Sequence, residues 1–243
     1  MFFISTTIAV ALNFVISSAS PAMADEPLNP LTNLAESKLL LRAKLADLSF
    51  FSANFTQEVV SEAGELLEKS SGKLAISKPN LANWHTQEPD ELAIVSDGND
   101  VWFYNPWIEQ VSVYSLSAAI AKTPILLLTS KDESLWQQYT VSKELVTQTT
   151  IVDTDVNEEG DRFIIRAKDP HSQIKSLTLV FEKINKNNKN AQQSELSQFS
   201  FLDATGQVSH IKLSKFEAKN KPESSLFSFT LPEGVQIDDQ RAN

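Results

Sequence analysis

The chain has 243 residues, a formal net charge of −10 and no cysteine. Residues 1–24 contain no charged side chain, so all of this negative charge lies in the rest of the chain and makes nucleic acid and anionic membrane surfaces poor partners. The absence of cysteine excludes disulfides and an N-terminal lipidated cysteine, so we expect a protein that is not itself lipid-anchored.

The first 24 residues have the pattern of a secretory signal peptide. An apolar run extends from Phe2 to Ile16, and Ala22-Met23-Ala24 forms an A-x-A cleavage motif before Asp25. A membrane anchor is the alternative, but the run is short for a spanning helix. We therefore expect a signal peptide over residues 1–24 and a single mature domain over residues 25–243.

One amphipathic helix is predicted at the start of the mature domain. Asn29-Pro30 resembles an N-cap followed by proline at the first helical position, and leucines follow at helical spacing. The pattern predicts a helix over about residues 30–47.

After this helix the pattern changes to strands and turns. Phe51, Ala53 and Phe55 alternate with polar residues, as in a half-buried strand, and the Asn- and Lys-rich stretch from Asn185 to Ser194 is expected to be an exposed hairpin loop. Closely spaced turn signals predict an antiparallel meander instead of β-α-β units. These signals are Ser70-Ser71-Gly72, Asp97-Gly98-Asn99, Glu159-Gly160-Asp161, Asp203-Ala204-Thr205-Gly206 and Pro232-Glu233-Gly234.

The stretch 115–131 interrupts the strands. An apolar run before Thr123-Pro124 and another after it predict two short helices that are divided at the proline. Two strands, Leu92–Val95 and Val101–Tyr104, are apolar on both faces, whereas an antiparallel sheet commonly has one wet face. The helices, or an enclosed apolar space, are expected to cover one of these faces.

No motif for catalysis is visible. The chain lacks a cysteine nucleophile and the G-x-S-x-G, H-E-x-x-H, phosphate-loop and G-x-G-x-x-G patterns. His85, near three carboxylates, could be drawn as a base, but a strand-end side chain in water is the simpler interpretation. The stretch 153–157 begins like a calcium loop but has Glu158 in place of the turn glycine and Ile164 in place of the bidentate glutamate. We expect no catalytic residue, no metal and no cofactor.

An aromatic group around Trp84 and Trp102 fits either a packed core or a binding cavity. It lies within Lys78-Pro79-Asn80-Leu81-Ala82-Asn83-Trp84-His85 and, further on, Val101-Trp102-Phe103-Tyr104-Asn105-Pro106. These lines resemble the outer-membrane lipoprotein carrier proteins, the LolA family. Further resemblances are Gln87-Glu88-Pro89-Asp90-Glu91, Val95-Ser96-Asp97-Gly98, Glu109-Gln110-Val111, Lys122-Thr123-Pro124, Trp136-Gln137-Gln138-Tyr139, Phe227-Ser228-Phe229, Pro232-Glu233-Gly234-Val235 and Asp238-Asp239-Gln240-Arg241.

The resemblance implies a mainly β protein with some α: an incomplete antiparallel β-barrel covered by a lid of short helices at about residues 115–131. It implies a periplasmic chaperone that binds the acyl chains of lipoproteins released from the inner membrane by an ATP-driven transporter. The chaperone would deliver them to an outer-membrane acceptor, acting as a monomer that does not bind nucleic acid. The alternative is a periplasmic half-barrel that binds other lipids or senses envelope stress, because fold alone does not define function.

The acyl chains are expected to bind between the strands and the lid. The predicted cavity residues are Trp84, Ile94, Trp102 and Tyr104 from strands and Ile120, Ile125, Leu126 and Leu127 from the lid. Strand parity decides this choice, because a shift of one residue would select Val95 and Phe103 instead.

Lys78 is the predicted gate of the lid. The family typically has an arginine at the matching position, which hydrogen-bonds to lid groups and holds the empty form closed. Lysine retains the charge but not the planar fork of donors. The alternative is an exposed lysine at a strand end. Some relatives have a large aromatic residue where this chain has Ala82, so that apolar contact is missing here.

Overall fold

The computed structural model describes residues 30–120, 123–146, 160–183 and 194–241. The predicted signal peptide, the calcium-like stretch 153–157 and residues 185–193 of the predicted loop lie outside these ranges. The first helix, α1 (Pro30–Asp47), has the predicted bounds.

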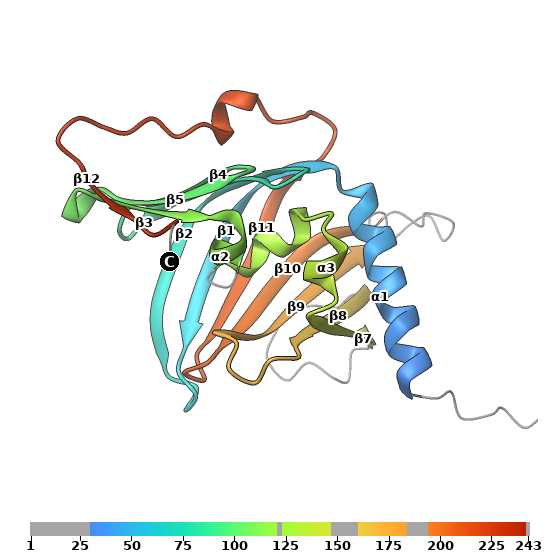
Figure 1. Ribbon diagram of the computed structural model, residues 1–243. Coiled ribbons are helices and arrows are strands. Elements are labelled where there is room, and N and C mark those ends of the chain that lie inside the picture. Colours follow the sequence, from blue (N-terminus) through green and yellow to red (C-terminus); the bar gives the residue numbers. More distant parts are fainter. Residues whose placement is uncertain (1–29, 121–122, 147–159, 184–193, 242–243) are drawn as a thin grey trace, which may run out of the picture.

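Twelve strands form one curved sheet that does not close (Figure 1). Its spatial order is β12-β6-β5-β4-β3-β2-β1-β11-β10-β9-β8-β7, and neighbouring strands are antiparallel except for the parallel pair β12 and β6. The predicted fold class, an unclosed antiparallel barrel with few helices, is therefore confirmed. The strands are β1 (Phe50–Val60), β2 (Leu66–Ser77), β3 (Leu81–Glu88), β4 (Leu92–Asp97), β5 (Asp100–Asn105), β6 (Gln110–Ser115), β7 (Tyr139–Val146), β8 (Gly160–Ala167), β9 (Ile174–Lys183), β10 (Ser194–Asp203), β11 (Val208–Glu217) and β12 (Gln236–Asp239).

The turn predictions hold where glycine has a positive φ, as at Gly98 (φ 103°) between β4 and β5 and at Gly206 (φ 85°) between β10 and β11. The prediction of a turn at residues 70–72 is wrong, because these residues lie inside β2. At Gly72 an added Cβ would stand 2.0 Å from the carbonyl oxygen of His85 on β3. This glycine therefore permits a close approach of two strands, at a register shift between Ser71 and Gly72. Gly160 likewise begins β8 instead of forming a turn.

Short helices lie over the concave side of the sheet (Figure 1). They are α2 (Leu116–Ile120), the 3₁₀-helix η2 (Pro124–Thr129) and α3 (Glu133–Trp136). The two apolar helices divided at Pro124 are confirmed, with η2 tighter than an α-helix; α3 was not predicted. We call α2 and η2 the lid. In the described ranges, no helix has the length and apolar character needed to cross a membrane.

A C-terminal segment crosses the convex side of β2–β5 before β12 joins the edge of the sheet (Figure 1). It includes the 3₁₀-helix η3 (Ser224–Phe227), which lies on β3 and β4, and the side-chain amide of Asn83 donates to the carbonyl oxygen of Leu226 at 2.6 Å. A further short 3₁₀-helix, η1 (Pro106–Ile108), connects β5 and β6. The strands that are apolar on both faces are thus covered on both, by the lid inside and by the C-terminal segment outside.

Candidate functional site: the apolar interior beneath the lid

The lid packs its apolar side chains against the concave face of the sheet. Ile120, Ile125 and Leu127 are buried, and Leu126 is 0% exposed. Proline at the start of η2 fits a helix that begins there, since its missing N–H would be unpaired at that position. The backbone N–H of Thr123 donates to the carbonyl of Ala119 at 2.8 Å, which joins the two helices of the lid. All four predicted lid residues therefore face the protein interior.

The end of the lid is fastened by hydrogen bonds to carbonyl oxygens. The backbone N–H of Asn80, in the turn between β2 and β3, donates to Thr129 at 3.4 Å, and the indole of Trp136 donates to Ser130 at 3.3 Å. Helix α1 reaches the same region from outside: the Lys38 ammonium donates to the carbonyl of Trp136 at 2.6 Å. These few bonds leave apolar packing as the main force that holds the lid down.

Lys78 lies beside this turn, but its ammonium does not bind the lid among the described residues. It donates to the carbonyl oxygen of Leu45 near the end of α1, while its backbone N–H donates to Ser49 at 2.8 Å. Desolvation by burial, helped by the nearby charge of Lys131 and opposed by Asp47, lowers the pKa of Lys78 to about 8. The predicted partner was a group of the lid; the observed partner is α1, because the turn places Lys78 under the C-terminal end of that helix. The alternative of an exposed lysine is not what the structure contains.

Trp84 and Ile94, two of the predicted strand residues, lie on the concave face. They are directly paired across β3 and β4, so their side chains share that face. The ring of Trp84 lies 4.1 Å from that of Phe55 and 6.1 Å from that of Phe199, between centroids. Its indole N–H donates to the hydroxyl of Thr86 at 3.1 Å. Trp84 thus forms part of the packed apolar floor, as predicted for its face.

The prediction that Trp102 and Tyr104 line the same space is wrong. Ile94 pairs with Phe103, so the side chains of residues 102 and 104 point to the other face. There both rings pack on Phe229 of the C-terminal segment, at 5.9 and 5.8 Å between centroids. Phe103 and Val101 occupy the concave face instead. The error is one residue of register, in a strand whose two faces are equally apolar.

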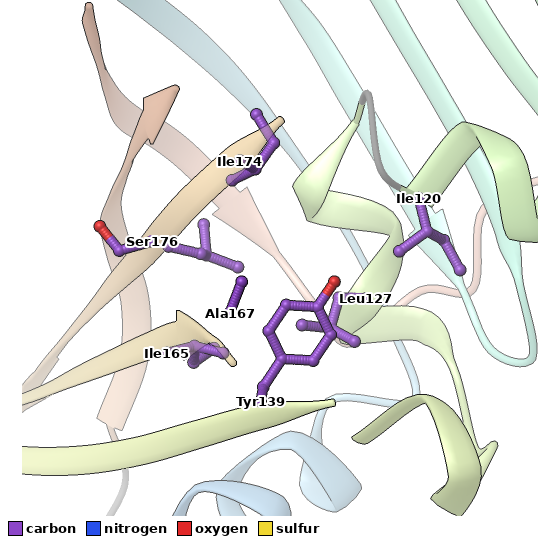
Figure 2. Close-up of a pocket in the computed structure, with 8 residues that line it drawn as sticks. Ile120, Leu127, Tyr139, Ile165, Ala167, Ile174 and Ser176 are labelled. Atoms are coloured by element: carbon purple, nitrogen blue, oxygen red, sulfur yellow. The ribbon is translucent and has the colours of Figure 1, made fainter. Parts of the chain in front are cut away.

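A small cavity of about 10 Å³ remains between the lid and the sheet (Figure 2). A volume of this size holds at most about one water molecule. Two predicted lid residues line it, and its strand residues come from β7, β8 and β9, which the sequence analysis did not select. The lining consists of Ile120, Leu127, Tyr139, Ile165, Ala167, Ile174, Ser176 and Leu177. The alternation Phe163, Ile165, Ala167 in β8 was the signal that could have found these strands.

A larger hollow of about 320 Å³ adjoins this cavity at the rim of the half-barrel. Tyr139 and Ala167 line both spaces, so the two are neighbours. The hollow lies between α2 and the turn from β8 to β9, and its lining is more polar. The lining residues are Ala118, Gln138, Tyr139, Ala167, Asp169, His171, Ser172 and Gln173. We call this hollow the mouth.

The interior is apolar and offers little to catalysis. No cluster of three or more metal-ligating residues occurs in the described parts of the chain, and His85 is at the surface, 2.8 Å from Glu91. Fold and site together define an open half-barrel with an apolar interior under short helices, the kind of protein that can house an apolar ligand.

Comparisons with known proteins give the family. Residues 46–230 match the family model described as outer membrane lipoprotein carrier protein LolA. Curated proteins named outer-membrane lipoprotein carrier protein match over most of their length. The protein from Aeromonas salmonicida is 36% identical over 85% of this chain and 91% of its own, and that from Shewanella sediminis is 40% identical over 84% and 86%. The chain therefore belongs to the LolA family of outer membrane lipoprotein carrier proteins.

A solved structure also matches, a LolA superfamily protein from Nitrosomonas europaea. It is 14% identical with a TM-score of 0.43, and the match covers 79% of this chain and 98% of that one. The family assignment rests on the sequence relatives and not on this likeness.

Proposed function

We propose that this chain is a periplasmic carrier that receives the acyl chains of outer-membrane-directed lipoproteins in the space now filled by the lid. One observation carries the proposal: an apolar lid lies on an apolar concave face with only about 10 Å³ left between them. Membership of the LolA family supplies the class of cargo. No metal, cofactor or catalytic residue is needed for this task.

The energetics suit reversible binding. Burial of each large apolar side chain of the lid is worth about 1.5–3 kcal/mol, so the empty protein keeps the lid closed. A buried methylene is worth about 0.8 kcal/mol, so acyl chains can replace the lid on the sheet when the lid lifts. The exchange trades similar apolar contacts, and it therefore shields the cargo from water without holding it irreversibly.

The remaining parts of the proposal come from family resemblance and from the N-terminal sequence. The chain is exported, is cleaved after Ala24 and works as a monomer. It accepts lipoproteins from an ATP-driven transporter of the inner membrane and passes them to an acceptor at the outer membrane. Lys78 contributes to gating through its bond to α1, which lies against the helices at the end of the lid.

The direct test is release of a lipoprotein from inner-membrane vesicles. Vesicles with an active transporter and an acylated lipoprotein are incubated with ATP and the purified mature protein, and the supernatant is assayed for a soluble complex. We expect release that depends on the carrier and on ATP. If the lipoprotein stays in the vesicles while a carrier from a relative releases it, the proposal is wrong.

The location of the acyl chains is tested with photoreactive residues. A photoreactive amino acid at Ile165, in the cavity wall, is expected to crosslink the radiolabelled acyl chains of the cargo. Tyr104, on the opposite face of the sheet, is the matched control and should give no acyl crosslink. Crosslinks from residue 104 without any from residue 165 would place the ligand outside the half-barrel.

A further inference from the structure

The mouth differs from the rest of the interior in its polarity. The cavity beneath the lid is lined by apolar side chains apart from Ser176 and the hydroxyl of Tyr139, whereas the mouth is lined by Gln138, Asp169 and Gln173 among others. A ligand that extends from one space into the other must be apolar at its inner end and polar at its outer end. Tyr139 stands at the boundary, since it lines both.

The hydroxyl of Tyr139 is a hydrogen-bond donor without a partner. Among the residues that the structure describes, no side chain or backbone group hydrogen-bonds to it. The side chain is partly buried, and desolvation raises the pKa of the hydroxyl above its usual value, so it is protonated near neutral pH. Figure 2 shows its ring close to Leu127 of the lid. A partly buried phenol usually finds an acceptor, and here the acceptor has to come from a ligand.

The outer wall of the mouth is held in a fixed shape by its own hydrogen bonds. The carboxylate of Asp169 accepts from the backbone N–H of His171, and the hydroxyl of Ser172 donates to the carbonyl of Ile174, both at 2.8 Å. The carbonyl of Gln173 accepts from Ala204 at 2.8 Å, which ties this turn to the next hairpin. On the other side, the carbonyl of Gln138 accepts from Lys168 at 2.9 Å. A rim arranged in advance loses little entropy on binding.

The charge of the mouth selects among lipids. It contains one carboxylate, Asp169, and no lysine or arginine side chain lines it. Nearby Lys175 donates to the carbonyl of Pro170 at 2.6 Å. A phosphate group would therefore meet negative charge without a facing cation, whereas a neutral ester or amide carbonyl would meet donors.

We propose that the mouth binds the neutral polar linkage of the acylated anchor, with the hydroxyl of Tyr139 donating to an ester or amide carbonyl. The polypeptide of the cargo then leaves between α2 and the turn from β8 to β9. This inference rests on the proposed carrier function and adds to it the chemistry that is recognised and the direction in which the cargo points.

The test compares two neutral lipids that differ only in carbonyl groups. Dioctanoylglycerol and its ether analogue dioctylglycerol compete with a fluorescent fatty-acyl probe bound to the mature protein. A net hydrogen bond of about 0.5–1.5 kcal/mol corresponds to roughly a two- to tenfold preference for the ester. In Tyr139→Phe that preference should disappear while affinity for the ether stays as in the wild type, which also shows that the variant is folded. Tyr104→Phe, on the opposite face, is the matched control and should keep the preference.

The outcomes separate the two proposals. Equal binding of ester and ether by the wild type, or a preference that survives in Tyr139→Phe, overturns the linkage site but leaves the carrier function standing. If the wild type binds neither lipid nor the probe, the carrier function is overturned and this inference with it.

The exit direction has its own readout in a loaded complex. A photoreactive residue at Gln173 should crosslink the polypeptide of a bound lipoprotein, whereas one at exposed His210 on β11 should not. Crosslinks to the polypeptide from residue 210 and none from residue 173 would overturn the proposed direction.

Discussion

The buried ammonium of Lys78 gives a prediction with a worked sign. We consider Lys78→Met, which keeps a long apolar stem but removes the charge and the bond to Leu45. The carbonyl of Leu45 also accepts from the backbone N–H of Leu48 at 3.1 Å, so it keeps one partner. A hydrogen bond from a charged group is worth about 1.5–3 kcal/mol, and the relief of burying an ammonium offsets part of it, which leaves a net loss of about 1 kcal/mol near pH 7.

The pH dependence is more diagnostic than the loss itself. The pKa of Lys78 falls from 10.5 to about 8 on folding, so between these values the unfolded chain binds more protons than the folded one. Stability contributed by this residue therefore rises with pH in that window. From pH 7 to 9.5 the full shift would add about 2 kcal/mol; partial exposure of the side chain reduces this to about 1 kcal/mol.

The assay is urea unfolding of wild type, Lys78→Met and Lys78→Arg at both pH values. The wild type should gain about 1 kcal/mol over the methionine variant on going from pH 7 to 9.5. The arginine variant restores a charged donor but remains protonated, so its stability should follow that of the methionine variant with pH. Parallel profiles for all three proteins, or a gain of the opposite sign, would refute the description of Lys78 as a desolvated cation bound to α1.

Three other substitutions test the fold. Gly72→Ala should destabilise the protein by several kcal/mol or prevent folding, as measured by urea unfolding, because its Cβ would stand 2.0 Å from a backbone oxygen of β3. Phe229→Ala should cost about 3 kcal/mol or less and make the C-terminal segment sensitive to protease, because it removes the ring on which Trp102 and Tyr104 pack; unchanged cleavage would contradict the clamp. Arg42→Ala should change stability by less than about 1 kcal/mol, because its ion pair with α3 is exposed; a larger loss would mean that the pair closes the lid.

Much of the architecture could be predicted because it depends on local signals. The N-cap and proline at residues 29–30 mark the start of α1, and Thr123-Pro124 divides the helices of the lid where the structure has the division. The gap between β1 and β2 was harder, since Ser70-Ser71-Gly72 has a turn-like composition. A glycine needed for close approach of strands has the same letter as one needed for a turn, and only the position of His85 distinguishes them.

The candidate site was only half predictable for a related reason. In strands that are apolar on both faces, composition carries no information on which side is concave, so Trp84 was placed correctly and Trp102 was not. The C-terminal segment that covers Trp102 lies more than a hundred residues away in sequence, and nothing local announces that contact.

By itself, the sequence determined the strand-rich architecture, the position of the lid and the family, because these depend on patterns within a few residues or on motifs in a fixed order. Tertiary structure alone decided which strand face is concave, that Lys78 meets α1, and that Tyr139 stands between an apolar cavity and a polar mouth. Those features arise where β2, β7 and β8 are brought against helices from other parts of the chain, and their physical cause is the curvature of the sheet.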